Sequence, residues 1–316
     1  MMENTSALSM FTLSGLDFSL EQRIALFVGT ILWYLLILWG NLTLIFVIIT
    51  DRHLHEPMYV FVCNLCLNSV YGTVGFFPKF LKDLFSSHVI SYAACMLQGY
   101  VIHSSTCADF SILTLMAYVA ICQPLSYHAV MTKLKVSVFL FLSWFIPLFC
   151  MFMNTATLIG VRLCGSRINR LYCVNWTVFR LTCSPPMANV AVSYFNMLFY
   201  FGHAVFIAYT YLYMIRTCKL SRENMGKFMQ TCLPHLICLG IYSTTVLLDL
   251  LYIRFGSADL SQHLSNFMAI ENLLIPPLLN PLVYGFKLTK LCEKMRISFE
   301  AIKHVLDCNQ TCDFSL

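Results

Sequence analysis

The segment Ile24–Thr50, IALFVGTILWYLLILWGNLTLIFVIIT, contains no charged residue. About 20 apolar residues in an α-helix cross a bilayer core about 30 Å thick, so this segment is long enough to span a membrane. The residues before it do not resemble a cleaved signal peptide, because they lack a basic region and are interrupted by Glu3 and Asp17. We therefore expect this first helix to direct the chain into the membrane.

Six further segments are long, apolar and free of Lys and Arg. They are Pro57–Pro78, Val89–Cys122, Val136–Val161, Met187–Ile215, Phe228–Tyr252 and Leu264–Phe286. The sequence therefore predicts an all-α membrane protein, a seven-transmembrane-helix bundle. We expect a single domain over residues 1–316, with an amino terminus at 1–23, the bundle at 24–286 and a tail at 287–316.

The overall composition excludes several classes of protein. Hydrophobic residues make up 59% of the chain and charged residues 11%, against about a quarter in an average soluble domain. The net charge of +5 is not concentrated in a basic block, so we expect no nucleic-acid partner. No metal motif, nucleophile constellation or phosphate loop indicates an enzyme. A small transporter is a remote alternative, because the two halves show no internal repeat.

The distribution of basic residues predicts the orientation. The tail and the loops on its side together hold twelve Lys and Arg, against eight on the side of residues 1–23. This bias predicts an extracellular amino terminus and a cytoplasmic tail. Asn4-Thr5-Ser6 is a sequon for N-glycosylation on the outer side, and Asn175-Trp176-Thr177 is a second candidate.

Four cysteines are expected on the outer, oxidising side: Cys95, Cys164, Cys173 and Cys183. Four cysteines allow three pairings, and the spacing alone does not choose among them. After the seventh segment, apolar residues alternate with Lys287, Lys290 and Lys294 at helical spacing. This pattern predicts a short amphipathic helix on the inner leaflet, in which Cys292 is either palmitoylated or unmodified.

An ordered set of motifs resembles the olfactory (odorant) receptors of the rhodopsin-like G-protein-coupled receptor family. Each motif is short, but together they cover nearly the whole chain. They are Gly40-Asn41, Leu54-His55-Glu56-Pro57-Met58-Tyr59, Met116-Ala117-Tyr118, Ala208-Tyr209, Lys227 with Thr231, Cys232, His235 and Leu236, and Pro277-Leu278-Leu279-Asn280-Pro281-Leu282-Val283-Tyr284. Asn64–Asn68 and Gln230–His235 look most like fish odorant receptors.

This resemblance implies a multi-pass receptor of the plasma membrane that detects a small-molecule odorant. It also implies signalling through a stimulatory heterotrimeric G protein, no cofactor, and the disulfides Cys95–Cys173 and Cys164–Cys183. We expect the odorant to contact outer-half residues of helices three, five, six and seven, namely His103, Thr106, Cys107, Tyr194, Met197, Val246, Leu250 and Asn272. The corresponding activation residues are Tyr209, His235, Pro281 and Tyr284.

The chain departs from this family at two places. Family members usually carry Asp-Arg-Tyr after Met-Ala-Tyr, but here Tyr118 is followed directly by Val119. We expect helix three to keep its register through Tyr118, with the inner loop pulled inward; a distorted lower helix is the alternative. A receptor fold with impaired signalling, such as a decoy or a pseudogene-like product, is therefore the second hypothesis for the function. In helix two, Ser69 stands where most odorant receptors have Asp.

Three acidic residues lie inside predicted helices, where a charge costs a few kcal/mol unless it faces protein or water. Asp109 either forms an ion or polar network with Ser69 and Asn280, with a possible sodium ion, or is a protonated acid with one structural hydrogen bond. Asp249 and Glu271 either meet a cationic ligand group or extend to the outer surface, and for Asp249 we favour the surface. His103 is either a pocket residue or a structural side chain.

Overall fold

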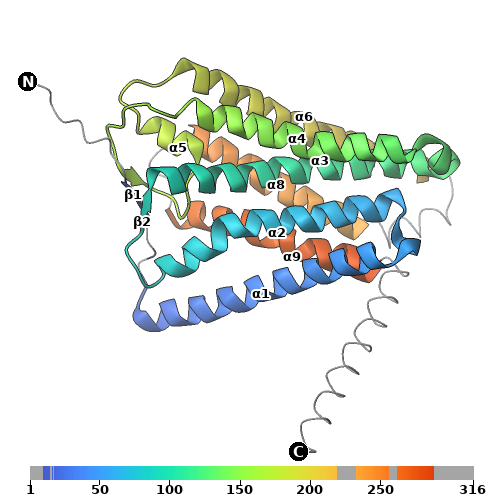
Figure 1. Cartoon of the computed structure of the whole chain (residues 1–316), viewed down its shortest axis with the longest axis horizontal. Helices are drawn as coiled ribbons and strands as arrows, with labels where there is room; N and C mark the ends of the chain where they lie inside the picture. The colour runs from blue at the N-terminus through green and yellow to red at the C-terminus, as the bar shows by residue number, and fades with distance from the viewer. Residues whose placement is uncertain (1–9, 15, 17, 219–232, 256–261, 288–316) are drawn as a thin grey trace, which may run out of the picture.

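Seven long helices run side by side in the computed structural model of this protein (Figure 1). The structure describes residues 10–14, 16, 18–218, 233–255 and 262–287, with the backbone alone at 119–130, 214, 217–218, 233–239, 241, 262–265, 272 and 283–287. Within this part, the long helices are α1 (Leu20–Thr50), α2 (Pro57–Asp83), α3 (Tyr92–Val130), α4 (Lys133–Ala156), α6 (Met187–Cys218), α8 (Leu233–Phe255) and α9 (Gln262–Lys287).

Each predicted span corresponds to one of these helices, but several ends differ from the prediction. Helix α2 continues past the predicted end at Pro78 to Asp83, and Val89–Ser91, at the start of the third predicted span, is a strand. Helix α3 continues to Val130, beyond the predicted end at Cys122. Helix α4 ends at Ala156 rather than Val161. The chain turns after α4 and reaches Gly160, whose φ of 76° is a left-handed conformation that glycine adopts without strain. Among the described residues, α1, α2, α4 and Met187–Tyr213 of α6 are long and apolar enough to cross a membrane by composition alone.

The outer surface of the bundle is apolar, as a lipid-facing surface must be. On α4, Phe141, Phe145, Phe149 and Phe152 are all about half exposed or more, at 62%, 49%, 51% and 56%. The first three stack on one another at a helical spacing of four. A surface of this kind would promote aggregation in water, so a bilayer is the solvent that fits it.

Small and polar residues hold the helices close together in the interior. Gly72 of α2 lies so near α3 that an added Cβ would meet Ser105 Cβ at 2.9 Å. Between α1 and α9, Asn41 Nδ2 donates to the carbonyl oxygen of Pro277 at 2.8 Å, and Gly40 faces Pro281. The bilayer core holds no water that could hydrogen-bond backbone groups. Hydrogen bonds and close contacts between helices satisfy these groups instead.

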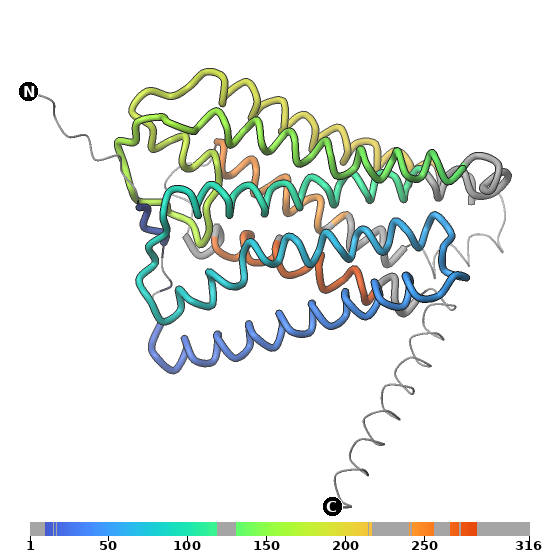
Figure 2. Tube along the Cα trace, viewed as in Figure 1, coloured from blue at the N-terminus to red at the C-terminus, as the bar shows by residue number. Residues whose placement is uncertain are grey.

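A small sheet closes one end of the bundle, which we call the sheet end. Its strand order is β2-β1-β3, formed by β1 (Met10–Leu13), β2 (Val89–Ser91) and β3 (Arg167–Ile168). Strand β1 is antiparallel to β2 and parallel to β3. The chain trace in Figure 2 shows that the α1–α2 and α3–α4 connections lie at the opposite end. The short helices are η1 (Arg52–Leu54) in the α1–α2 connection and α5 (Asn175–Arg180) at the sheet end.

Candidate ligand-binding cavity

Two disulfides fix the segment between α4 and α6 over the sheet end. Cys95 at the start of α3 is bonded to Cys173, and Cys164 is bonded to Cys183. These are the two pairs that the family resemblance implies. The backbone N–H of Cys173 also donates to Gln98 Oε1 at 3.0 Å, and Gln98 Nε2 donates to the carbonyl of Gly75. The segment is therefore tied to both α2 and α3, and it covers the interior of the bundle.

An asparagine of α4 holds three elements around this covered region. Asn154 Nδ2 donates to Ser193 Oγ of α6 at 3.2 Å, and Asn154 Oδ1 accepts from Asn189 of α6 and from Asn175 of α5. Asn175 Nδ2 also donates to Thr155 Oγ1. Because a buried polar group requires partners, this cluster fixes α5 against α4 and α6.

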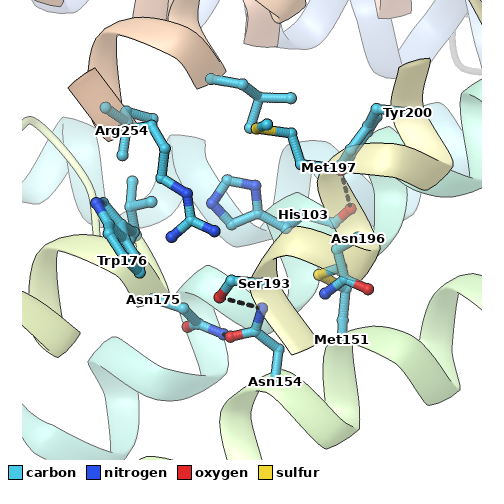
Figure 3. A pocket seen from close by; sticks show the side chains of 13 residues that line it. His103, Met151, Asn154, Asn175, Trp176, Ser193, Asn196, Met197, Tyr200 and Arg254 are labelled. Atoms are coloured by element: carbon cyan, nitrogen blue, oxygen red, sulfur yellow. Dashed lines mark hydrogen bonds between the residues drawn. The ribbon is translucent and has the colours of Figure 1, made fainter. Parts of the chain in front are cut away.

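A cavity lies beneath α5, between α3, α4, α6 and α8 (Figure 3). Small-molecule sites are mostly apolar with a few polar groups. Its lining combines both kinds of side chain: His103, Met151, Asn154, Val174, Asn175, Trp176, Ser193, Asn196, Met197, Tyr200, Leu250, Ile253 and Arg254.

A second pocket of about 330 Å³ continues toward α8 and α9. It shares His103, Tyr200 and Leu250 with the first and adds Thr106 and Val246, among others. Tyr200 connects α6 to α3, since its hydroxyl donates to the carbonyl oxygen of His103 at 3.2 Å. The two spaces therefore meet at these three shared residues in the centre of the bundle.

Five of the eight expected ligand-contact residues line one of these two spaces. They are His103, Thr106, Met197, Val246 and Leu250. Cys107 does not line either one; it is buried in the main core. Tyr194 is 42% exposed on α6 and does not line them either. The side chain of Asn272 lies outside the described part of the chain.

Several lining residues were not predicted from the sequence. Asn175 and Trp176 come from the covering segment, whose path no helical periodicity reveals. Asn154 and Asn196 lie within predicted helices, as polar residues in apolar surroundings, whereas Arg254 lies just beyond the predicted span Phe228–Tyr252. A polar side chain inside an apolar helix is the feature that singled out Asp109 in the sequence. The same feature could have singled out Asn154 and Asn196.

Asp249 does not extend to the outer surface, so that part of the prediction is wrong. Its side chain is 6% exposed, and Arg170 of the covering segment donates to Asp249 Oδ1 through Nη1 and Nη2, both at 2.8 Å. Burial disfavours the charge on Arg170, but the Asp249 carboxylate raises the pKa of this guanidinium above its ordinary value. Glu271 of α9 accepts a hydrogen bond from Thr245 of α8, so it also faces a neighbouring helix.

The polar network around Asp109 differs from the expected one. Asn68 Nδ2 donates to Asp109 Oδ1 at 2.7 Å and to the carbonyl of Ser105 at 2.8 Å. Ser69 instead accepts from Asn280 Nδ2 at 3.0 Å. Asp109 therefore pairs with the residue before Ser69, because Asn68 rather than Ser69 faces α3, and Ser69 connects α2 to α9.

At the end opposite the sheet, α3 is continuous across Tyr118–Val119. Tyr118 packs edge-on against Phe139 of α4, with the ring centroids 6.3 Å apart. Helix α3 therefore runs without a break through Tyr118 to Val130, where an inner loop was predicted. The register of the residues after Tyr118 relative to the family stays a prediction.

Tyr209 does not face the interior, contrary to its expected role in activation. It is 62% exposed, whereas Ile207, Thr210 and Tyr211 of the same helix are buried. These three residues define the inward face of α6, and Tyr209 lies between them on the opposite side. Pro281 faces Gly40. The side chains of His235 and Tyr284 lie outside the described part of the chain.

The predicted glycosylation and palmitoylation sites lie partly inside and partly outside the described residues. Asn175 is 6% exposed, and its amide nitrogen donates to Asn154 and Thr155, so a glycan on this residue does not fit the fold. Asn4, the predicted amphipathic helix and Cys292 lie outside the described residues.

A family model described as olfactory receptor matches residues 30–301 of the chain. Olfactory receptor 51E1 of Homo sapiens is 30% identical over 308 residues, which cover 95% of this chain and 96% of that protein. Olfactory receptor 6E1 of Mus musculus is 29% identical over 298 residues, 90% and 93% of the two chains. Squid rhodopsin has a similar fold, with a TM-score of 0.69 at 12% identity over 91% of this chain and 88% of that structure.

Proposed function

Because this chain belongs to the olfactory receptor family, we propose that it binds a small-molecule odorant and signals through a stimulatory heterotrimeric G protein. The membership confirms the family recognised from the motifs, and it identifies the chain as a multi-pass membrane receptor rather than an enzyme. The narrower resemblance to fish receptors stays a prediction.

The proposed orientation has the sheet end outside the cell and the tail in the cytoplasm. Two observations support it. Both disulfides lie at the sheet end, and disulfides form and persist on the oxidising side of a membrane. The opposite end and the tail together hold twelve Lys and Arg, against eight on the side of the sheet end. Glycosylation of Asn4 would then occur on the outer side, and the amphipathic helix would lie on the inner leaflet.

The cavity beneath α5 is the observation that carries the proposed function. It lies beneath a disulfide-fixed segment and combines apolar with polar lining residues. We propose that the odorant binds here and in the adjoining pocket, with contacts to His103, Met197, Val246 and Leu250.

Signalling would follow if the odorant binds one arrangement of the helices more tightly than another. Helix α3 offers a direct connection between the two ends. It carries His103 in the cavity, Asp109 in the polar network and Tyr118 near the opposite end. A sodium ion at Asp109 stays a prediction, and its ligands would include Asp109 and Asn68.

Point substitutions in the cavity provide the test. For any odorant that stabilises the purified receptor against heat, Val246→Ala and His103→Ala should each weaken the apparent affinity, because His103 lines the cavity and Val246 lines the adjoining pocket. Phe149→Ala is the control for loss of apolar volume, since Phe149 is 51% exposed on the lipid-facing surface of α4. Unchanged binding in both cavity variants would show that the odorant binds elsewhere.

A receptor with impaired signalling is the second candidate function, and one observation favours it. Tyr118 is followed directly by Val119, so the Asp-Arg-Tyr triplet of the family is absent. Such a receptor would still bind its odorant, and the thermal measurement above would detect that binding. Cyclic AMP would rise little in the same cells.

A further inference from the structure

A third pocket lies at the sheet end, apart from the cavity beneath α5. It lies between the segment from β1 to the start of α1, which we call the strap, the first turn of α1, the end of α2 and the covering segment. Its described polar lining residues are Ser14, Arg23, Asp83 and His88. None of the described residues that line it also lines the cavity or the adjoining pocket. This strap pocket is therefore a separate site, which the proposed function leaves unused.

The hydroxyl of Ser14 indicates that the strap pocket holds a ligand. Its oxygen is buried and, within the described part of the chain, has no hydrogen-bond partner. The backbone of this residue is fixed, because its N–H donates to the carbonyl oxygens of Ile168 and Arg170 in the covering segment, at 2.9 and 3.1 Å. Buried hydroxyls are normally satisfied, since leaving one without a partner is costly. A ligand in the pocket would accept the missing hydrogen bond.

Arg23 gives the strap pocket an excess positive charge. The residue is half-buried, and its Nε donates to the carbonyl oxygen of Phe18 at 2.9 Å. Its Nη1 and Nη2 make no hydrogen bond or ion pair with any residue that the structure describes. The acidic lining residue, Asp83, is already paired with Lys79 one turn earlier in α2, through both carboxylate oxygens. Because Lys79 cancels the charge of Asp83, the charge of Arg23 stays unbalanced among the described residues.

His88 and an apolar wall restrict what the strap pocket can hold. The carbonyl oxygen of His88 accepts a hydrogen bond from Leu13 N–H at 2.8 Å, so this residue lies against the strap. Its imidazole can donate a hydrogen bond through a ring N–H. Phe80, Leu84 and Leu171 form the inner wall, and each is only 4–6% exposed, within a core cluster. Such a wall cannot compensate a second charge, so a small ligand with a single charge fits this pocket.

We propose that the strap pocket binds a small monovalent anion such as chloride, held by the Arg23 guanidinium and the Ser14 hydroxyl. The anion accepts the missing hydrogen bond of Ser14 and balances the charge of Arg23, and charge-assisted hydrogen bonds are stronger than neutral ones. Because Ser14 is bonded to the covering segment and Arg23 belongs to α1, the bound anion connects these two elements. In the proposed orientation this site opens to the extracellular fluid. The inference does not depend on which odorant binds beneath α5.

The test measures thermal unfolding of the purified full-length receptor in nanodiscs of neutral lipid. Chloride replaces gluconate, a much larger monovalent anion, at constant ionic strength and pH 7.4. We expect chloride to raise the midpoint of unfolding by about 2–4 °C and to reach saturation, as a ligand of the folded state does. Bromide and acetate, which are also small and monovalent, should stabilise the receptor in the same way.

Variants of the two proposed anion ligands then assign the effect. Arg23→Gln should abolish the response to chloride. Ser14→Ala should raise the half-saturating concentration about 10-fold or more, the ratio for one hydrogen bond to a charged group. Arg162→Gln and Ser87→Ala are the matched controls, because both residues are exposed and lie outside the lining of the strap pocket. Both controls should keep the response of the unaltered receptor.

Two results would overturn the inference. An unfolding midpoint that is the same in chloride and gluconate, or that rises with chloride without saturation, would show that the pocket has no anion site. A full chloride response in both Ser14→Ala and Arg23→Gln would place the anion elsewhere. If Arg23→Gln does not fold, Ser14→Ala still decides, because it removes one hydroxyl and keeps the backbone hydrogen bonds of the strap. Neither result bears on the proposed odorant function, which rests on a different cavity.

Discussion

Arg170 of the covering segment donates two hydrogen bonds of 2.8 Å to the same oxygen of Asp249 in α8, and both side chains are buried. The guanidinium also lies 5.5 Å from the ring centroid of Tyr252. Arg170 is three residues from Cys173, which is bonded to Cys95 of α3. The pair therefore connects α8 to a segment that is covalently fixed to α3, beside the adjoining pocket that Asp249 lines.

Breaking this ion pair from one side should destabilise the receptor strongly. Asp249→Asn or Arg170→Met leaves a buried charge without its partner, a change that typically costs about 3–5 kcal/mol. We expect a clearly lower midpoint of thermal unfolding for each single variant in detergent. The double variant Arg170→Met/Asp249→Leu should recover most of the loss, because apolar residues of similar size often replace a buried pair without cost. A double variant as unstable as the sum of the two single variants would argue against a dominant role of the charge.

Removing the disulfide at the start of α3 should loosen the covering segment. The double variant Cys95→Ala/Cys173→Ala should lower the free energy of unfolding by about 2–4 kcal/mol. Peptide mapping without reduction should recover Cys95 linked to Cys173 and Cys164 linked to Cys183. A peptide that joins Cys95 to Cys164 would contradict the pairing in the structure.

A methyl group at Gly72 should separate α2 from α3. The added Cβ would meet both Cβ and Oγ of Ser105, so Gly72→Ala should destabilise the bundle by about 1–3 kcal/mol. Gly202→Ala in α6 is the matched control, because nothing lies within 4 Å of a Cβ there. In a helix that change should be neutral or stabilising by up to about 1 kcal/mol. Equal thermal midpoints for the two variants would show that α2 and α3 can move apart freely.

Restoring the family's triplet should restore coupling. Insertion of Asp-Arg-Tyr between Tyr118 and Val119 should raise odorant-dependent cyclic AMP at equal surface expression, because it supplies the missing Arg. Since three residues also lengthen a helix by about 4.5 Å, insertion of Asp-Ala-Tyr is the control for length. We expect a gain with the first insertion only. Strong signalling by the unaltered chain, with no gain on insertion, would show that this receptor couples without the triplet.

The sequence determined the class of the fold because a bilayer imposes simple requirements on composition. The chain has seven apolar segments without Lys or Arg. In a bilayer core, the backbone N–H and C=O groups of such segments find hydrogen-bond partners within α-helices, and the structure describes seven long helices. The ordered motifs identified the family for a related reason. Short contacts such as Asn41 with Pro277, or Gly40 with Pro281, need those residue types at those positions.

Only the tertiary structure decided how individual polar side chains face and which partners they find. Asp249 pairs with Arg170, which lies 79 residues away in a segment without periodicity, so no local pattern could reveal that partner. Tyr209 faces outward because the rotation of α6 buries Ile207, Thr210 and Tyr211 instead. Arg254 was not singled out from the sequence, and only the packed structure places its guanidinium 3.5 Å from the ring centroid of Trp176 and 4.4 Å from that of Tyr194. The composition along the chain shows which segments enter the membrane. The partners of buried charged residues depend on how each helix is rotated and on the course of the loops, and only the packed structure fixes these.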